Sequence, residues 1–471
     1  MAMVELTERA RIAHLLRRAG FGATAAELDE YQALGFTGAV ERLLNPEKIA
    51  QPELDVRINA LDLDPATNRD AFAALQVAWF DRMIATKNPL QEKLALFWHG
   101  HFATAESKVG SPFLMRQQYQ LFLALGLGNF RDLAVAVSKN PAMLIWLDGN
   151  QNRAKSPNEN YGRELLELFM LGIGNYTEND VKAAARAFTG WSFTGDRSVS
   201  GGRQYISGTF AFDEKQHDKN PKTFLGQAIG TPANGDWLSD GLAIIDGALR
   251  QPAAARFIAG KLFSFFVWDG PDAATIAPFA EAFARNTFDL RELLRAILLS
   301  PEFSSERAYR AKAKSPSEYV VGLLRALGVP NATRDTVNSA RRMGQELFNP
   351  PNVGGWTSGL GWISPGSILD RANFANRTVT ARQTNATAVM FDPALAMQGK
   401  ALTTPEQFTD HFVGLLLDGN ATPEQRAALN NYLRLNDKGQ LGTFALDAKT
   451  LDSKVRGLIH LVASAPAYQL S

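Results

Sequence analysis

Apolar residues recur along most of this chain at spacings of three and four positions, which is the period of an amphipathic helix. In TAAELDEYQALG (24–35), Thr24 is placed to cap the first turn and Gly35 to end the helix. No βαβ alternation is seen, so the pattern predicts a mainly α, multi-helix fold around a single core. The same spacing recurs in 5–18, 69–85, 89–99, 112–125, 129–138, 177–188, 236–249, 252–267, 288–299, 316–327, 367–380, 404–417, 422–434 and 447–463.

Two stretches depart from the helical pattern. In 192–232, aromatic and small residues alternate, which predicts a small inserted β-hairpin around 200–226. Residues 347–367 are too rich in Pro and Gly for a helix, and long irregular loops in compact domains often carry function. We expect one helical domain over 1–471, with the 192–232 insertion joining two candidate subdomains. These subdomains are 1–191 and 233–471.

Composition narrows the function classes. The 471 residues are 45% hydrophobic, and 49 basic residues nearly cancel 48 acidic ones, which argues against nucleic acid as a partner. The lack of cysteine excludes disulfides, thiolate metal sites and thiol nucleophiles. No apolar run reaches the roughly 18 residues of a membrane span. The N-terminal segment MAMVELTERARIAHLLRRAGFG lacks the pattern of a signal peptide.

The helix expected over 159–171 carries a polar stripe on an otherwise apolar surface. Such a stripe is ordinarily solvated and held by ion pairs between residues four apart. Because the stripe has no lysine and asparagine is a poor helix former, the pattern also favours a buried site, in which carboxylates must be paired, metal-bound or functional. On a helical wheel the stripe spans an arc of about 140° and consists of Glu159, Asn160, Arg163, Glu164 and Glu167.

Three of the six histidines sit in unusual settings. His99 and His101 flank Gly100 at the end of an apolar helix, where they share a metal only if Gly100 unwinds the helix end. Considered alone, each ring more often satisfies a buried carbonyl or carboxylate. His217 lies in the loop FDEKQHDKNPKTFLG, beside Asp218, so His217→Ala is expected to change stability little.

If the fold gathers these groups, they form a metal site. Their nitrogen and oxygen atoms suit Zn, Mn or Fe, although none of the diagnostic spacings such as HExxH is present. The candidate metal ligands are His99, His101, His217 and Glu164. The candidate catalytic groups are Glu159, Arg163, Glu164, Glu167 and His217, with Arg163 orienting carboxylates or an anionic substrate group. The candidate substrate-binding residues are Asn160, Lys222, Trp356 and Trp362.

Paired carboxylates also permit metal-free glycan cleavage, with Glu159, Glu164 or Glu167 as the acid. Trp356 and Trp362 would then suit a sugar-stacking surface, although tryptophan in an irregular loop more often covers a core. The sequence lacks the GxSxG elbow, the Walker A loop and a GxGxxG after a strand. Catalysis by a serine nucleophile, nucleotide binding and dinucleotide binding therefore have no support.

A series of long motifs runs through the chain in order: LLRRAGFGAT (15–24), FWHGHF (97–102), NENYGRELLELFMLGIGNYTENDVKAAARAFTGW (158–191), FDEKQHDKNPKTFLG (212–226), ARFIAGKLFSFFV (255–267) and NPPNVGGWTSGLGWIS (349–364). With these motifs the chain closely resembles the bacterial domain of unknown function family 1800 over nearly its whole length. The resemblance implies no established reaction. It implies that relatives are exported, often behind a leader, and are encoded beside a sulfatase-like protein of the domain of unknown function family 1501.

By this likeness, the family's motif positions fall on His99, His101, Asn158, Glu159, Arg163, Glu164, Glu167, Trp191, His217, Asp218, Lys222 and Trp356. Many relatives carry His where this chain has Phe169, so a shared metal site would lack that ligand here. The favoured hypothesis is an enzyme with a buried His/Glu/Arg site that uses a divalent metal, with hydrolysis and oxidation not distinguished. The rival is a non-catalytic binding or assembly protein, whose partner is the sulfatase-like protein or a polysaccharide.

Overall fold

The computed structural model describes residues 7–64, 67–200, 203–230, 232, 235–381, 391–397, 399–436 and 438–471. Within these residues the fold is mainly α, which confirms the class predicted from the hydrophobic pattern. The first part contains α1 (Glu8–Arg18), α2 (Ala25–Ala33), α3 (Gly35–Leu44), η1 (Pro46–Lys48), α4 (Pro52–Asn59), α5 (Ala71–Ala85), α6 (Pro89–His101), α7 (Glu106–Val109), α8 (Pro112–Leu125), α9 (Phe130–Ser138), α10 (Pro141–Trp146) and η2 (Gly149–Gln151).

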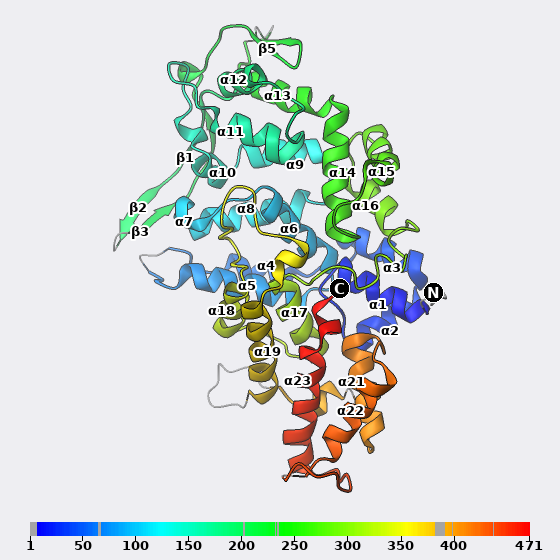
Figure 1. Ribbon diagram of the computed structural model, residues 1–471. Helices are drawn as coiled ribbons and strands as arrows, with labels where there is room; N and C mark the ends of the chain where they lie inside the picture. Colours follow the sequence, from blue (N-terminus) through cyan, green and yellow to red (C-terminus); the bar gives the residue numbers. More distant parts are fainter. Residues whose placement is uncertain are drawn as a thin grey trace.

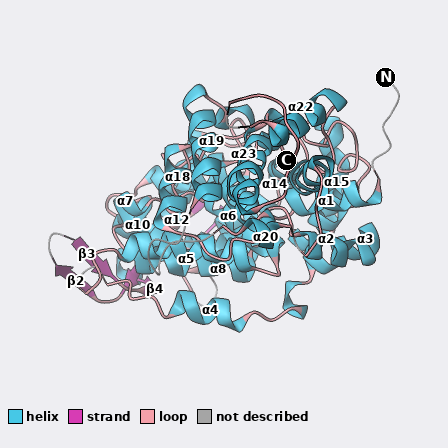
Figure 2. Ribbon diagram, turned by 90° about the horizontal axis from the view of Figure 1, so that it is seen from below, coloured by secondary structure: helices cyan, strands magenta, loops and turns pink. Residues whose placement is uncertain are grey.

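The middle of the chain holds the polar segment and the strands. It contains α11 (Glu159–Glu164), the π-helix η3 (Leu165–Met170), α12 (Glu178–Ala187), β1 (Trp191–Thr194), β2 (Arg197–Ser200), β3 (Arg203–Ile206), β4 (Thr209–Phe212), η4 (Glu214–Gln216), β5 (Lys222–Phe224) and β6 (Gln227–Ile229). β1 pairs with β4 and β2 with β3, all antiparallel, so these strands form one long hairpin. Figure 2 shows this hairpin projecting from the helical body. The predicted hairpin is thus present, although residues 201–202 lie outside the described residues, and β5 with β6 adds a second, smaller one.

The last part is again helical. It contains α13 (Ser239–Leu249), α14 (Pro252–Phe266), α15 (Ala273–Arg285), α16 (Leu290–Leu298), α17 (Pro316–Ala326), α18 (Arg334–Arg342), η5 (Gly359–Trp362), α19 (Pro365–Thr380), α20 (Pro393–Ala396), α21 (Pro405–Leu417), α22 (Pro423–Arg434), the π-helix η6 (Thr450–Val455), α23 (Arg456–Ser464) and η7 (Pro466–Gln469). In Figure 1, α9 to α13 lie at one end of the molecule, α5, α6 and α8 near its middle, and α19 and α21 to α23 at the other end.

The helix starts follow local chemistry. The Thr24 hydroxyl accepts the N–H of Glu27, while the Glu27 carboxylate accepts the N–H of Thr24, which confirms the predicted cap of α2. Asn158 caps α11 by accepting the N–H of Asn160. The helix expected over 159–171 does not stay regular, because it widens into η3, where the N–H of Leu171 bonds to the carbonyl of Leu166.

One contiguous cluster of buried apolar side chains extends through the molecule, from Ile12 in α1 to Tyr468 in η7. Trp79, Trp98 and Trp191 are among its fully buried members. The division into candidate subdomains stays a prediction. Across the described residues, every helix is too short or too polar to span a bilayer.

Candidate functional site

A cavity of about 700 Å³ lies where three of the sequence motifs meet. The C-terminal end of α6 and one face of α14 form two walls, and the segments 269–276, 312–318 and 356–362, together with Gln345, complete it. We call this space the α6–α14 cleft. His101, Trp356 and Trp362, which the sequence singles out in separate motifs, all line it.

Two glycines allow the α6 end and the 349–356 segment to touch. Gly355 has φ 83°, and a Cβ on it would lie 2.2 Å from the carbonyl oxygen of Gly100. The ring of Trp356 then packs edge-on against His99, with 5.0 Å between the ring centroids. The glycines of FWHGH and NVGGW are therefore needed for backbone approach, which places Trp356 on the cleft wall.

His99 positions the irregular segment and does not face an open site. Its Nε2 accepts the N–H of Phe348 at 3.0 Å, and Phe348 has the left-handed φ of 62°. The carbonyl of Phe348 accepts the N–H of Glu106 at 2.8 Å. Burial lowers the pKa of His99 to about 3, so the ring is neutral and keeps the lone pair that this contact requires.

His101 points elsewhere, toward the end of η3. Its Nε2 lies 3.0 Å from the carbonyl oxygen of Phe169, and because a carbonyl only accepts, Nε2 carries the ring proton. Nδ1 is then an acceptor, and Lys261 Nζ on α14 donates to it at 3.3 Å. Lys261 also donates to the carbonyl of Leu168 at 3.0 Å. The last turn of η3 leaves carbonyls without helical partners, and His101 and Lys261 satisfy two of them.

Lys261 is a cation without a nearby anion. Among the described residues no carboxylate forms an ion pair with it, and the centroid of the Phe257 ring lies 4.6 Å from its Nζ. Burial lowers the pKa of Lys261 to about 8. Lys312, on another part of the cleft wall, is instead paired with Asp269. Lys261 is therefore the largely buried cation of the cleft that is available to a ligand, whereas Arg256, which also lines the cleft, is exposed.

The polar stripe of α11 and η3 is half-exposed, which corrects the expectation that it is buried. Arg163 and Glu159 keep 34% and 38% of their side chains exposed and pair at 3.1 Å, as ordinary surface residues four apart do. Arg163 also binds Glu178 at 2.7 Å, and Glu167 accepts a hydrogen bond from Tyr176 at 2.8 Å.

Glu164 makes no hydrogen bond or ion pair within the described part of the chain. Burial, together with the nearby Glu167 charge, raises its pKa. The neighbouring Asn160, a candidate for substrate binding, is half-buried and donates to the carbonyl of Leu147 at 3.3 Å. The catalytic and substrate-binding roles of the stripe stay predictions.

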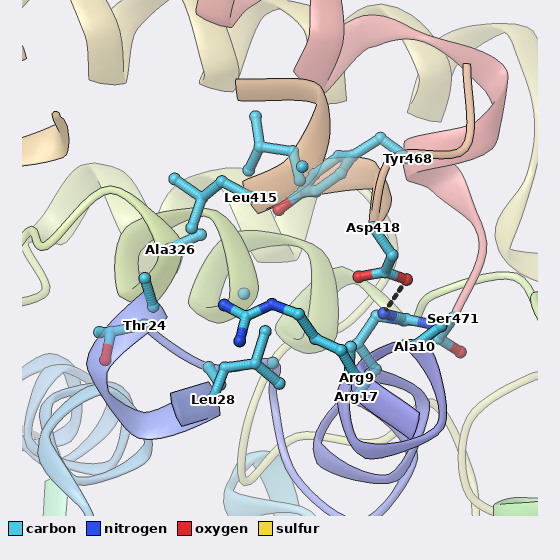
Figure 3. A pocket seen from close by; sticks show the side chains of 18 of the residues that line it. Arg9, Ala10, Arg17, Thr24, Leu28, Ala326, Leu415, Asp418, Tyr468 and Ser471 are labelled. Atoms are coloured by element: carbon cyan, nitrogen blue, oxygen red, sulfur yellow. Dashed lines mark hydrogen bonds and ion pairs between the residues drawn. The ribbon is translucent and has the colours of Figure 1, made fainter. Parts of the chain in front are cut away.

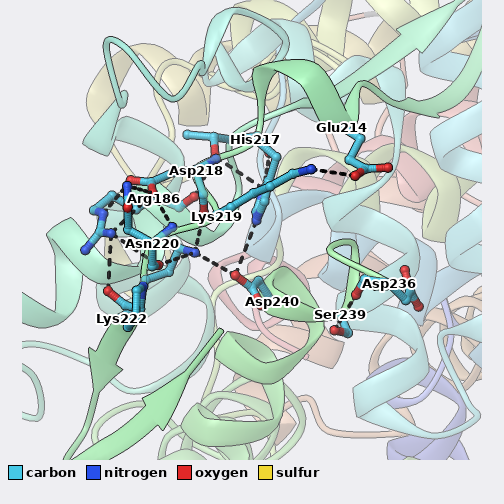
Figure 4. Close-up of polar contacts among 12 residues, drawn as sticks. Arg186, Glu214, His217, Asp218, Lys219, Asn220, Lys222, Asp236, Ser239 and Asp240 are labelled. Atoms are coloured by element: carbon cyan, nitrogen blue, oxygen red, sulfur yellow. Dashed lines mark hydrogen bonds and ion pairs between the residues drawn. The ribbon is translucent and has the colours of Figure 1, made fainter. Parts of the chain in front are cut away.

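His217 belongs to a separate network between α12, β5 and α13 (Figure 4). Its Nδ1 lies 2.8 Å from the carbonyl of Thr189, and its Nε2 lies 3.3 Å from Asp240 Oδ2. Lys222 Nζ donates to the same Asp240 oxygen at 2.6 Å. The side chains of His217, Lys222 and Asp240 are at most 2% exposed. We call these three residues the Asp240 network.

The adjoining Asp218 is held by Arg186, with 2.6 Å between Nε and Oδ2. Burial would raise the pKa of Asp218, but the hydrogen bonds from Arg186 and Asn220 outweigh it and lower the pKa to about 2. Asp240 behaves alike, because the hydrogen bonds from His217 and Lys222 lower its pKa against the effect of burial. Lys222, a candidate substrate-binding residue, thus lies inside a sealed network.

The proposed metal ligands are not gathered into one site. Within the described ranges, no three His, Asp or Glu side chains form a group that could hold a metal ion. The physical reason is that α6 stays helical through Gly100, so that His99 and His101 point to Phe348 and Phe169 respectively. His217 is tied to Asp240, and Glu164 lies on the half-exposed stripe. Metal dependence itself stays a prediction.

The sequence interpretation missed Lys261, although it lies within a quoted motif. Lys261 is the sole charged residue in FIAGKLFSFFVW (257–268), and a lone lysine in an apolar helix must find special partners or face a cavity. The sequence shows this anomaly. It does not show that Lys261 donates to one carbonyl oxygen, of Leu168, and to one imidazole nitrogen, of His101, and is paired with no acid in the described structure.

Comparisons with known proteins place the chain in a family but not in a functional class. A family model described as protein of unknown function (DUF1800) matches residues 14–470, and the chain belongs to this family. None of the curated proteins and none of the solved structures that were compared with the chain matches it.

Proposed function

We propose that this member of the DUF1800 family is an enzyme whose active site is the α6–α14 cleft. In this proposal Lys261 exchanges a proton with the bound ligand, and His101 holds the lysine in position. The observation that carries the proposal is Lys261 itself, a lysine that lines a cavity of about 700 Å³ with no carboxylate paired to it in the described structure.

The pKa of Lys261 suits proton transfer near neutral pH. With a pKa of about 8, roughly a tenth of the Lys261 side chains carry no proton at pH 7. The neutral amine can take a proton from a ligand and return it, while the contacts to Leu168 and His101 keep the nitrogen in place. Trp356 and Phe257 offer flat apolar walls against which a carbon skeleton can pack.

Labelling of lysines with trinitrobenzenesulfonate between pH 6 and 11, followed by peptide mass spectrometry, tests whether the Lys261 amine is reactive near neutral pH. We expect half-maximal reactivity of Lys261 near pH 8, and the exposed Lys182 and Lys215 serve as internal references. If Lys261 reacts only together with these references, its amine is not available near neutral pH and the proposal is wrong.

Turnover is tested by screening metabolites with the wild type, Lys261→Met and Lys261→Arg. Arginine keeps the charge but does not release its proton in this pH range. We therefore expect Lys261→Arg to bind a ligand without converting it, and Lys261→Met to lose both properties. A Lys261→Arg variant that turns over normally would show that Lys261 is no proton-transfer group.

Two other enzymatic proposals remain. Metal-dependent chemistry is tested by elemental analysis of protein purified without chelator, where about one equivalent of Zn, Mn or Fe that is lost in Glu164→Gln would support it. Metal-free glycan cleavage is supported by Glu164, whose pKa burial raises beside Glu167, as an acid catalyst requires. Loss of glycan hydrolysis in Glu164→Gln, with unchanged folding, is the expected result.

A non-catalytic binding or assembly role is the proposal from another class. The specific observation that favours it is the sealed Asp240 network, whose side chains are at most 2% exposed and link α12, β5 and α13 in one arrangement. The partner in this case is a sulfatase-like protein or a polysaccharide at Trp356 and Trp362. A ligand that binds the cleft in wild type and Lys261→Met alike, without turnover, would support this role over catalysis.

A further inference from the structure

A second cavity, of about 300 Å³, lies between α1, the start of α2, α17 and α21. Figure 3 shows Leu28, Ala326 and Leu415 around it, from three different elements, with the contact between Arg17 and Asp418 at one side. Apolar side chains thus form one part of its wall, and charged and polar residues form much of the rest. This volume is at the lower end of the range for ligand sites, which suits a small organic molecule.

The unusual member of this cavity is Lys314. The residue is only 5% exposed, and its Nζ lies 3.4 Å from the centroid of the Tyr468 ring. Within the described residues the ammonium makes no hydrogen bond and no ion pair. Lys312, two positions earlier, is paired with Asp269 and lines the other cavity. The two lysines are therefore a natural contrast between a paired and an unpaired cation.

The acids around the cavity are already engaged with other groups. Asp418 accepts from Arg17, Arg310 and Tyr309. Glu318 pairs with Lys93 and also accepts the N–H of Ser315 at 2.6 Å, and Asp410 pairs with Arg426. Among the described residues, no Asp or Glu side chain of the cavity is thus left unpaired to serve as the counter-ion of Lys314.

Neighbouring positive charges further disfavour the protonated form of Lys314. Burial lowers the pKa of Lys314 well below its ordinary value, and the charges of Arg310 and Arg17 lower it further. The charges of Asp418 and Glu318 act in the opposite direction but do not outweigh these effects, and a buried ammonium without a directly paired acid is costly. A bound anion would remove this cost and would draw the proton back onto the amine.

We propose that the cavity between α1, α2, α17 and α21 binds a small organic anion, whose acidic group pairs with Lys314 and whose apolar body packs against Leu28, Ala326 and Leu415. The Tyr468 ring lies under the ammonium and holds it by a cation–π contact while the anion binds. This site is distinct from the α6–α14 cleft and does not depend on the enzymatic proposal.

Benzoate is a suitable probe, because it combines a carboxylate with a compact apolar ring. Thermal denaturation and titration calorimetry of the full chain would compare the wild type with Lys314→Met, with Lys312→Met as the matched control and Lys261→Met to report on the cleft. We expect a rise in Tm that saturates with benzoate in the wild type, Lys312→Met and Lys261→Met. In Lys314→Met the affinity should fall by roughly tenfold or more.

Several outcomes would overturn the proposal. Benzoate could fail to bind the wild type, or could bind Lys314→Met as tightly as the wild type, or could lose affinity only in Lys261→Met. If Lys314→Met does not fold, the wild type alone decides the question by reductive methylation with and without benzoate. Protection of Lys314 from methylation supports the proposal, and equal methylation in both conditions contradicts it.

Discussion

The Asp240 network and the α6–α14 cleft contain the same kinds of groups but differ in whether the lysine is paired with a carboxylate. In each, a histidine and a lysine lie close together among backbone carbonyls. In the first, Asp240 accepts from Lys222 at 2.6 Å and faces His217 at 3.3 Å, and the cluster is sealed. In the second, Lys261 donates to His101 and Leu168 but has no acid, and both side chains line a cavity of about 700 Å³.

The difference teaches that residue type alone does not mark a functional group. A carboxylate partner opposes the effect of burial on the pKa of a lysine, and removing one member of a buried pair is costly. A buried lysine without such a partner has only the lowering effect of burial and can exchange its proton more readily. The presence or absence of one carboxylate therefore separates a structural cluster from a chemically available one. The sequence interpretation ranked them in the opposite order, since it placed His217 and Lys222 in the site and passed over Lys261.

Lys222→Met should have the largest effect on stability. It removes the main partner of Asp240 and leaves a buried carboxylate with only His217, so unfolding in urea should show a loss of about 3–5 kcal/mol. The matched change in the cleft is Lys261→Met, which removes one hydrogen bond to the neutral His101 ring and one to the carbonyl of Leu168. It should lower the free energy of unfolding by only about 1 kcal/mol. Similar losses in the two variants would contradict the distinction between the two clusters.

Gly355→Ala should come next, because it disturbs the wall of the cleft and not the Asp240 network. The new Cβ would meet the carbonyl oxygen of Gly100, and the left-handed φ of 83° disfavours alanine, so we expect a loss of about 2–3 kcal/mol. The fluorescence of Trp356 should shift as well. Gly354→Ala is the control, since Gly354 does not have the left-handed backbone. An unchanged Tm in Gly355→Ala would mean that α6 and the 349–356 segment do not touch as described.

Acid should weaken the region around the Asp240 network. The pKa of Asp218 is about 2 in the folded protein and about 3.9 in an unfolded chain, so its contribution is fully present above about pH 5 and is lost as the pH falls toward 2. The contribution is about 2 kcal/mol. We would measure the free energies of unfolding of the wild type and Asp218→Asn in urea at pH 7 and pH 3. The difference between the two proteins should be larger at pH 7. Parallel pH profiles of the two proteins would refute this assignment.

Alkali should have the opposite effect on the cleft. Lys261 has a pKa of about 8 when folded and about 10.4 when unfolded, so the unfolded chain binds more protons between these values and stability rises with pH there. Between pH 8 and pH 10, the free energy of unfolding of the wild type, measured in urea, should rise relative to that of Lys261→Met. The expected rise is on the order of 1–2 kcal/mol, which includes a reduction for solvent screening. A flat difference between the two proteins over this range would show that the Lys261 pKa is not lowered.

Glu159→Gln should have the smallest effect. The side chains of Glu159 and Arg163 are both more than a third exposed, and pairs of this kind contribute little, so the change in urea unfolding should stay within about 0.5 kcal/mol. A loss comparable to that of Lys222→Met would mean that the stripe of α11 and η3 is a buried network after all.

Local chemistry made much of the fold predictable. Capping at Thr24, the apolar spacing of α6 and α14, and the Pro- and Gly-rich segment before α19 all correspond to observed elements. α15 and α18 were not predicted, because Pro278 interrupts the first and few apolar residues mark the second. The π-turns of η3 were not foreseen either, since the wheel of a regular helix assumes 100° per residue throughout.

The candidate site was predictable only in parts. His101, Trp356 and Trp362 were found as unusual residues, and they do share one cavity. The sequence predicts that His217 is a loop residue with little effect on stability, but the side chain is buried against Asp240, so we now expect His217→Ala to be destabilising. Asp240 lies outside every quoted motif, and a pattern of types and spacings does not reveal a partner that approaches from another helix.

By itself, the sequence determined the helical class, the place of the inserted hairpin, the irregular segment before α19 and the family to which the chain belongs, because these follow from short-range spacing, caps and motifs. Only the tertiary structure decided which charged groups have partners. Ion pairing and desolvation depend on atoms within about 4–6 Å, and residues that are distant in sequence supply them. For that reason Lys222 is sealed with Asp240, whereas Lys261 and Lys314 remain without an acid in the described structure.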